Sequence, residues 1–303
     1  MSRGHARAGD LHRTGALADR VRRAAGLLAP CVLCPRRCKV DRIAGETGVC
    51  RIGARAHVAS AAPHFGEEGP LVGVRGSGTV FFSGCNLRCS FCQNADISHR
   101  AAGPAVDSAG LARVMIEFES HGCHNLNLVT PSHVVPQILS ALEPALDDGF
   151  SLPIVYNSSG YDSVETLKLL DGVVDIYMPD LKFWHGEGAP YMENVDDYAE
   201  VATAAVTEMH RQVGDLHLVR GVAVSGLLVR HLVMPGHVTD TRAIMRFLAS
   251  LSPETYVNVM DQYRPSYRAC GDPAIGRPAG YSDYAAAIEA ARDAGLRRIE
   301  GHL

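Results

Sequence analysis

The stretch Thr79-Val-Phe-Phe-Ser-Gly-Cys85-Asn-Leu-Arg-Cys89-Ser-Phe-Cys92-Gln-Asn94 joins a short apolar run to three closely spaced cysteines. Residues 79–82 predict a buried strand, and the cysteines that follow have the spacing C-x3-C-x2-C. Three thiolates are one fewer than an iron–sulfur cubane normally takes, so one coordination position stays open. The stretch therefore predicts a strand that ends at an open metal site, with a zinc loop or three packed cysteines as the simpler alternative.

Downstream of this stretch, short apolar runs alternate with longer amphipathic segments. The predicted strands lie near residues 79–82, 125–129, 153–157, 174–178, 227–233 and 255–260. The predicted helices lie near residues 108–121, 134–147, 163–170, 195–213, 239–251 and 282–294. Such a series predicts an α/β fold with a parallel sheet, either an open doubly wound sheet or an incomplete barrel.

Both architectures place ligand-binding groups on the loops after the carboxyl ends of the strands. The connection 184–226 is longer than usual, and its Gly-rich part from Gly214 to Gly226 predicts a small hairpin over that site.

Composition excludes several other classes of protein. Lys and Arg number 29 against 33 Asp and Glu, a net charge of -4 that does not favour nucleic acid as a partner. No apolar run approaches the length of about 18 residues that a membrane span needs. The basic residues 1–30 lack the apolar region of a signal peptide and contain one predicted helix, 15–28. We expect a cytoplasmic protein.

A second cysteine group precedes the first strand. Of nine cysteines, four lie at Cys31, Cys34, Cys38 and Cys50, within a loop-rich region. Four ligands on short loops close a zinc site or hold a complete second iron–sulfur cluster, and the sequence leaves both open. The expected division is a basic, partly helical segment 1–30, a cysteine-rich metal-binding module 31–75, and a main domain 76–303.

The triplet resembles the signature of the radical S-adenosylmethionine superfamily, in which an aromatic residue precedes the third cysteine. The similarity extends to pyruvate formate-lyase activating enzyme-like iron–sulfur proteins, through segments such as Tyr156-Asn-Ser-Ser-Gly160, Met178-Pro-Asp-Leu-Lys182 and Val229-Arg-His-Leu-Val-Met-Pro-Gly236. The resemblance implies a partial (β/α)6 TIM-type barrel with a small cysteine-rich N-terminal module. It also implies a [4Fe-4S] cluster on Cys85, Cys89 and Cys92 whose open iron binds S-adenosylmethionine.

The resemblance further assigns residues to this cofactor. Phe91 would pack on the adenine, and the Asp180–Lys182 pair would hold the ribose and carboxylate. Thr130 and Ser132 stand where the superfamily usually carries a Gly-Gly-Glu motif for the ammonium group. The full expected set of cofactor-binding residues is Phe91, Asn94, Thr130, Ser132, Asn157, Asp180, Lys182, Arg230, His231 and Gln262. Arg230 and His231 are neighbours in a strand, so only one of them can face the interior.

The activity implied by the resemblance is reductive cleavage of S-adenosylmethionine to a 5′-deoxyadenosyl radical, which takes a hydrogen atom from a substrate. That substrate is either a small molecule or the glycyl loop of a partner protein. The expected electron donor is a protein such as flavodoxin or ferredoxin. The alternative is a non-catalytic iron–sulfur or zinc protein with a sensing or scaffold role.

Overall fold

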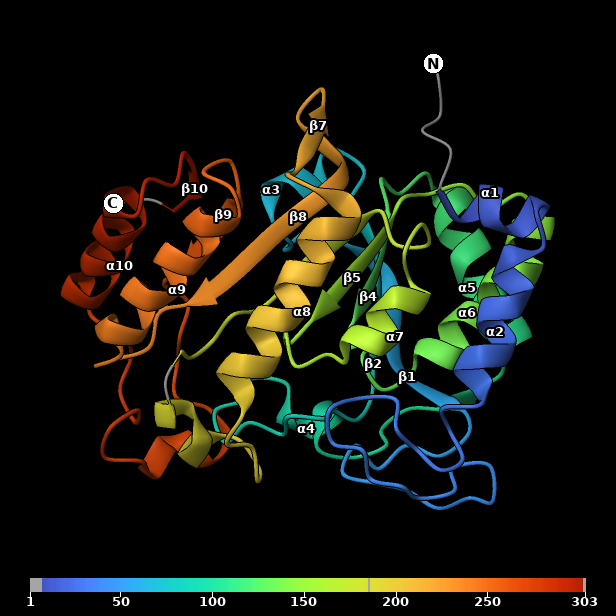
Figure 1. The fold of residues 1–303 in the computed structure, drawn as a ribbon, viewed down its shortest axis with the longest axis horizontal. Helices are drawn as coiled ribbons and strands as arrows, with labels where there is room; N and C mark the ends of the chain where they lie inside the picture. The colour runs from blue at the N-terminus through green and yellow to red at the C-terminus, as the bar shows by residue number, and fades with distance from the viewer. Residues whose placement is uncertain (1–6, 185, 302–303) are drawn as a thin grey trace.

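The computed structural model of the chain describes residues 7–184 and 186–301, which form a ten-stranded sheet with helices packed around it (Figure 1). The parallel strands are β2 (Ser77–Phe82), β4 (Leu126–Val129), β5 (Ile154–Ser158), β6 (Ile176–Pro179), β8 (Val222–Leu232), β9 (Tyr256–Met260) and β10 (Arg298–Glu300). The longer helices are α5 (Ser108–His121), α6 (Val135–Asp147), α7 (Val164–Leu169), α8 (Tyr198–Val213), α9 (Val238–Leu251) and α10 (Tyr281–Asp293).

The strand order decides between the two predicted architectures. Along the sheet the order is β10-β9-β8-β6-β5-β4-β2-β1-β3, so the parallel strands follow one another as they do in the chain. A doubly wound sheet instead reverses its direction at a switch point. Within the described residues, β10 and β3 (Ala105–Val106) lie at opposite edges and the sheet does not close. This arrangement confirms the predicted α/β fold, a partial barrel.

Local sequence explains why these elements form. All five residues of β5 are buried, as expected for a strand covered on both faces, and they read Ile-Val-Tyr-Asn-Ser. Helix α5 begins where the Asp107 side chain accepts a hydrogen bond from the Gly110 amide at 2.8 Å. It ends at Gly122, whose φ of 73° suits a glycine cap.

The N-terminal part differs in detail from the prediction. Helices α1 (Arg7–Arg13) and α2 (Ala16–Ala25) pack near α6, with Leu17 and Ala24 fully buried; residues 1–6 lie outside the described part. Residues 32–55 form neither helix nor strand. The rest of the predicted loop region contains β1 (Ala56–His64), which pairs antiparallel with β2, and the short helix α3 (Gly69–Val72).

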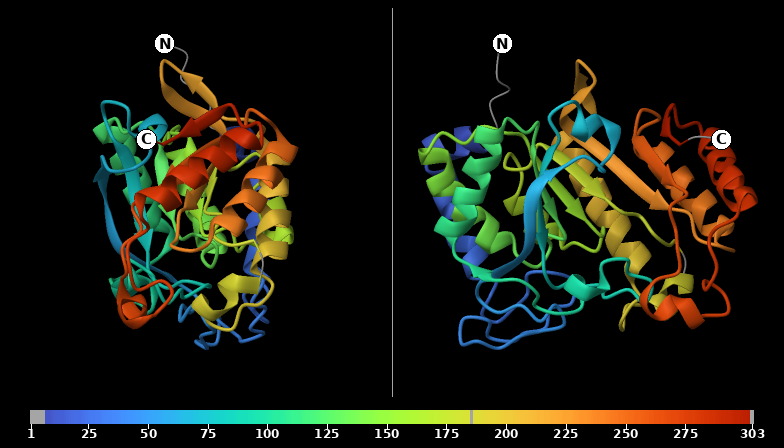
Figure 2. Two further views of the ribbon diagram at one scale, coloured as in Figure 1. Left: turned by 90° about the vertical axis from the view of Figure 1, so that its left-hand side faces the viewer. Right: turned by 180° about the vertical axis from the view of Figure 1, so that it is seen from behind.

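The loops after the strands gather at one end of the barrel. The cysteine loops, α4 (Ala95–Ser98), η1 (Gly186–Tyr191) and η2 (Tyr267–Gly271) all lie at this end (Figure 2). The predicted hairpin exists as β7 (His217–Val219) paired with the start of β8, but it lies at the opposite end and does not cover the site (Figure 1). Among the described helices, none has the length and apolar character to cross a membrane.

Candidate active site

A cavity of about 240 Å³ opens at the carboxyl ends of the parallel strands. We call it the cofactor cavity. Of the expected residues, the structure brings together around it Cys85, Cys89, Cys92, Phe91, Asn94, Thr130, Asn157, Asp180, Lys182, Arg230 and Gln262. These residues come from the loop after β2 and from strands or loops across the barrel, so the fold assembles residues far apart in sequence.

The cysteine triplet occupies one side of the cavity. Burial raises the pKa of the Cys85 and Cys89 thiols, and the nearby Lys182 ammonium acts in the opposite direction on both. The Leu87 amide donates to Cys85 Sγ at 3.3 Å, and Cys92 Sγ lies 3.1 Å from Ser98 Oγ. Hydrogen bonds to sulfur are one way in which a protein sets the reduction potential of an iron–sulfur cluster.

The donor set of the triplet suits an iron–sulfur cluster. The three thiols share one cavity and influence one another's charge. Cysteine thiolates are the usual ligands of such clusters, and the adjoining space of about 240 Å³ leaves room for a further ligand.

A network of charged side chains faces the thiols across the cavity. Asp180 Oδ1 accepts a hydrogen bond from Arg230 Nε at 2.8 Å, and Asp180 Oδ2 contacts Lys182 Nζ. Arg230 also donates to Asn157 Oδ1 at 2.8 Å. The side chains of Asp180, Lys182 and Arg230 are only 16%, 11% and 18% exposed, so each needs a partner in the protein or in a ligand.

Electrostatics keep these three groups charged. Burial acts to raise the pKa of the Asp180 carboxyl, but Arg230 and Lys182 outweigh it and hold that pKa below its ordinary value. Burial acts to lower the pKa of Lys182, but Asp180 and Cys89 outweigh it and raise that pKa. Asp180 therefore stays an anion and Lys182 a cation, and the Arg230 guanidinium, whose pKa the nearby carboxylates raise, also stays charged beside the cavity.

Thr130 has an unusual backbone for its residue type. It follows β4 with a φ of 60°, in the left-handed region that a β-branched residue rarely adopts. Its amide donates to the Asn157 carbonyl at 2.9 Å, which ties the residue after β4 to strand β5. Strain of this kind gathers at functional sites, so Thr130 supports the assignment of this edge.

Two expected residues lie elsewhere. His231 is the outward neighbour of Arg230 in β8: its Nδ1 donates to the Leu181 carbonyl at 2.8 Å, and its Nε2 lies 2.9 Å from Thr241 Oγ1. The alternation of side chains along a strand sends it away from the interior. Ser132 is also outside the cavity lining, because it is buried beside the Tyr156–Asp162 pair behind the loop.

Phe91 belongs to an aromatic cluster that the sequence does not reveal. It is 5% exposed, and its ring makes edge contacts with Phe183, Tyr191 and Tyr263 at centroid distances of 6.0, 6.5 and 6.3 Å. Adjacent Ser90 is held from both sides, because its amide donates to the Tyr191 carbonyl and its carbonyl accepts from the Arg268 and Ala269 amides. The η1 and η2 segments thus clamp the loop that carries the triplet.

Glu68 is another residue that the sequence did not indicate. Its Oε1 lies 3.5 Å from Arg230 and accepts from Asn258 at 3.3 Å, while its Oε2 is buried without a partner. Its carboxylate is therefore a second acidic partner of Arg230, besides Asp180. No motif marked it, since it lies in a segment predicted as loop.

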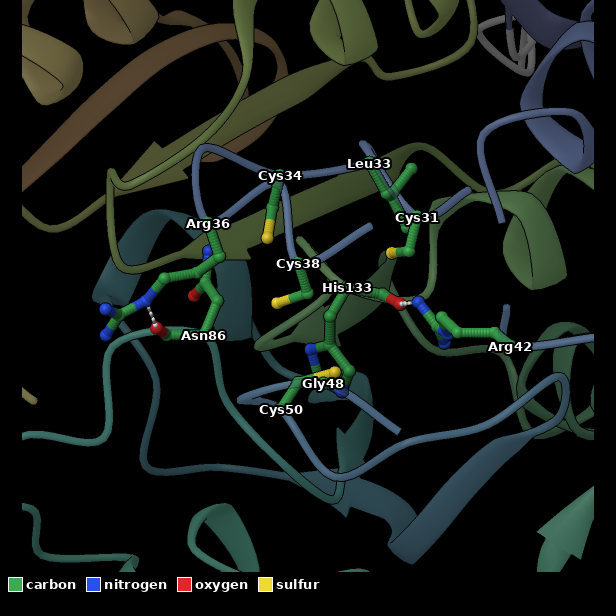
Figure 3. Close-up of a pocket in the computed structure, with 10 residues that line it drawn as sticks. All are labelled: Cys31, Leu33, Cys34, Arg36, Cys38, Arg42, Gly48, Cys50, Asn86 and His133. Atoms are coloured by element: carbon green, nitrogen blue, oxygen red, sulfur yellow. Dashed lines mark hydrogen bonds between the residues drawn. The ribbon is translucent and has the colours of Figure 1, made fainter. Parts of the chain in front are cut away.

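The upstream cysteines line a second, separate cavity, which we call the cysteine cavity (Figure 3). Cys31, Cys34, Cys38 and Cys50 all contribute to it, and burial raises the pKa of Cys34 to about 12. Gly48 is required there, because a Cβ at this position would lie 2.7 Å from Cys38 Sγ. The four cysteines therefore line one cavity, and a metal group held by them stays a prediction.

His133 connects the cysteine cavity to the barrel. Its Nε2 donates to the Ser83 carbonyl at 2.8 Å, and its own carbonyl accepts from Arg42 at 2.9 Å. Burial lowers the pKa of His133 to about 4, so the ring is neutral at pH 7.

The first comparison with known proteins concerns the segment that contains the cysteine triplet. Residues 69–168, which include Cys85, Cys89 and Cys92, match the family model described as a 4Fe-4S single cluster domain. Among solved structures, native anSMEcpe with bound AdoMet is similar with a TM-score of 0.48 and 10% identity, over 72% of this chain and 61% of that one. Its complex with AdoMet and the Cp18Cys peptide gives a TM-score of 0.46 and 10% identity, over 72% and 60%. This chain spans less than two thirds of the length of either structure.

The chain is an α/β protein with an open, barrel-like sheet, and its residues 69–168 match the model of a 4Fe-4S single cluster domain. The uncharacterized protein MJ0674 of Methanocaldococcus jannaschii is 33% identical over 277 residues, which are 89% of this chain and 76% of that protein. The chain belongs to the family of MJ0674.

Proposed function

We propose that the protein is a radical S-adenosylmethionine enzyme. The observation that carries the proposal is the cofactor cavity itself, in which three thiols face a carboxylate and two cations at the carboxyl ends of a partial barrel. The 4Fe-4S match over residues 69–168 supports the identity of the cluster. The C-x3-C-x2-C spacing supports the open iron.

The residues of the cavity have distinct roles in this proposal. Cys85, Cys89 and Cys92 hold three irons of a [4Fe-4S] cluster. Lys182 and Arg230 supply positive charge for the carboxylate of S-adenosylmethionine. Oxygens of Asp180 and Asn157 accept hydrogen bonds from its hydroxyl or ammonium groups. With both cofactors bound, one electron from the reduced cluster would break the C5′–S bond of S-adenosylmethionine, releasing methionine and a 5′-deoxyadenosyl radical that would take a hydrogen atom from the substrate.

The substrate is a molecule or peptide segment small enough to reach the mouth of the cofactor cavity. The proposal includes a small molecule or the glycyl loop of a partner protein, as the resemblance to pyruvate formate-lyase activating enzyme-like proteins implies. It also includes a low-potential electron donor such as flavodoxin or ferredoxin. Deuterium transfer from a labelled candidate into 5′-deoxyadenosine identifies the substrate.

The alternative is a non-catalytic iron–sulfur protein. A scaffold or sensor has no need for a carboxylate and two cations that line the same cavity as the thiols, because desolvation of these charges costs free energy. The network favours the enzyme.

The test is the product of cofactor cleavage. Protein reconstituted anaerobically with iron and sulfide, reduced with dithionite and supplied with S-adenosylmethionine should form 5′-deoxyadenosine, measured by chromatography. Cys89→Ala should abolish the product. Cys123→Ala is the matched control, because Cys123 is buried outside the cofactor cavity, and it should retain the product. Equal product formation by both variants would refute the proposal.

A further inference from the structure

A single stretch of backbone, residues 85–87, separates the cofactor cavity from the cysteine cavity. Cys85 and Leu87 line the cofactor cavity, whereas Asn86 between them lines the cysteine cavity. The two linings share no residue. A group held by Cys31, Cys34, Cys38 and Cys50 therefore lies behind the triplet loop and is screened from a substrate in the cofactor cavity.

Several contacts join the cysteine region to the triplet loop. Arg36, between Cys34 and Cys38, donates to the Asn86 carbonyl at 2.6 Å and to the Leu87 carbonyl at 3.4 Å (Figure 3). A third nitrogen of Arg36 donates to the Asn194 carbonyl at 2.7 Å. Gly84 packs so closely on Cys50 that an added Cβ would lie 2.4 Å from the Cys50 carbonyl oxygen. The backbone on both sides of Cys85 is thus held by residues 36 and 50.

The cysteine cavity also holds buried polar atoms without partners. Asn86 is fully buried; its Nδ2 donates to the Tyr161 carbonyl, and its Oδ1 has no hydrogen-bond partner. His133 Nδ1 is buried and unpartnered as well. Both residues line the space that the four cysteines enclose, so the cavity is polar as well as rich in thiols.

The spacing of the thiols favours a cluster over zinc. Figure 3 shows the four sulfur atoms distributed around the cavity rather than meeting at one point. Four thiolates complete the ligand set of a [4Fe-4S] cluster and leave no open iron.

We propose that Cys31, Cys34, Cys38 and Cys50 hold a complete second [4Fe-4S] cluster. Through Arg36, this second cluster stabilises the cluster at Cys85, Cys89 and Cys92, which is unstable when the second cluster is absent. The part that concerns the triplet rests on the proposed function. The physical reason is that residues 32–55 contain no helix or strand, so their shape depends on the group that they bind. When the second cluster is absent, Arg36 is no longer held in position, and the carbonyls of Asn86 and Leu87 lose their hydrogen-bond donor.

Metal content tests the first half of the proposal. Anaerobically reconstituted protein should contain about eight irons and eight sulfides per chain, the content of two [4Fe-4S] clusters. Cys34→Ala should lose about four of each or more. One zinc per chain in the unaltered protein, lost in Cys34→Ala, would overturn the second cluster.

Arg36→Ala tests the second half in a protein that keeps all its cysteines. Removal of a partner outside the metal ligands typically weakens metal affinity about 10- to 100-fold, so we expect iron to pass to a chelator faster than in the unaltered protein by about the same factor. Arg37→Ala is the matched control, because Arg37 is exposed and makes none of these contacts with the loop, and it should release iron at the unaltered rate. Equal rates for Arg36→Ala and Arg37→Ala would overturn the coupling.

Neither measurement depends on cofactor cleavage. Failure to form 5′-deoxyadenosine would refute the proposed function while leaving the iron counts and release rates as they are. Circular dichroism of each variant distinguishes lost coupling from a chain that does not fold.

Discussion

At the scale of single residues, Asp180 contributes most to the electrostatics of the site. Its carboxylate lies between Arg230 and Lys182, and all three side chains are largely buried. The removal of one partner from a buried ion network leaves the remaining charges uncompensated. Asp180 therefore stabilises both the charge pattern of the cofactor cavity and the fold around it.

Asp180→Asn should lower the free energy of unfolding by about 3 kcal/mol, because Arg230 and Lys182 then repel each other in a poorly solvated site. Urea denaturation of the cluster-free protein measures the change.

Asp171→Asn is the matched control for this charge removal. Asp171 pairs with Arg211 at 2.7 Å on the surface, where the two side chains are 36% and 55% exposed. Its loss should cost less than about 1 kcal/mol. If Asp171→Asn lowered the free energy of unfolding as much as Asp180→Asn does, burial of the Asp180 network would not be the cause of the larger expected effect.

Asp175 makes the free energy of unfolding depend on pH. Burial raises the pKa of its carboxyl to about 6, although the Ile154 amide donates to it at 2.9 Å. The unfolded chain releases this proton near pH 4, so between about pH 4 and 6 the folded protein holds more protons than the unfolded chain. The contribution of Asp175 to the free energy of unfolding therefore falls by about 3 kcal/mol as pH rises through this window.

Asp175→Asn removes the titrating group and should flatten this part of the stability profile. Urea denaturation of both proteins between pH 4 and pH 7 provides the comparison. The same slope in both would assign the pH dependence to another group.

Sequence could predict most residues of the cofactor cavity but not the direction of every side chain. Arg230 and His231 both suit a ligand, and alternation shows that one must face away. Which one does so depends on the pairing of β8 with its neighbours: Asp180 lies opposite Arg230 in a parallel bridge. Glu68 was missed because its contact with Arg230 joins residues that are far apart in the chain.

At the scale of secondary-structure elements, the loop after β5 is a tightly packed part of the cofactor cavity. Gly160 has a φ of 78°, and a Cβ there would lie 2.4 Å from the Asp180 carbonyl oxygen. The preceding Ser158 and Ser159 line the cavity. Close approach of the backbones after β5 and β6 thus shapes the site, and only glycine permits it.

Gly160→Ala should therefore lower the free energy of unfolding by about 3 kcal/mol or more, through left-handed strain and a backbone clash together. Gly149→Ala separates the two effects, because Gly149 has a φ of 90° with no atom within 4 Å of an added Cβ. It should cost only about 1 to 2 kcal/mol. Thermal unfolding of both variants tests the difference, and equal losses would show that the contact with Asp180 is not limiting.

The longer elements could be predicted because their patterns are local. The strand β6 and the helix α5 agree with apolar runs and cap signals in the sequence. The strand β1 was missed because its second half, near Ala61 and Ala62, is exposed and consists largely of small residues. The short η1 and η2 segments form through contacts with Ser90, and no local pattern indicates such contacts.

At the scale of the whole molecule, strand order determines where the site can form. Periodicity predicts the strands but not their neighbours; the family resemblance predicted a partial barrel over an open doubly wound sheet, and the strand order confirms it. The one-way order brings the ends of β2, β4, β5, β6, β8 and β9 around one cavity. The meeting of the two cysteine groups at Asn86 is likewise a long-range contact that spacing does not reveal.

The central claim is that an open iron at Cys85, Cys89 and Cys92 binds S-adenosylmethionine beside Asp180, Lys182 and Arg230. The most direct measurement is electron–nuclear double resonance of the dithionite-reduced protein with S-adenosylmethionine labelled with ¹⁵N at the amino group. Our account predicts a ¹⁵N coupling to the cluster in the unaltered protein and none in Cys89→Ala. A cluster signal that shows no coupling and does not change when the labelled cofactor is added would contradict it.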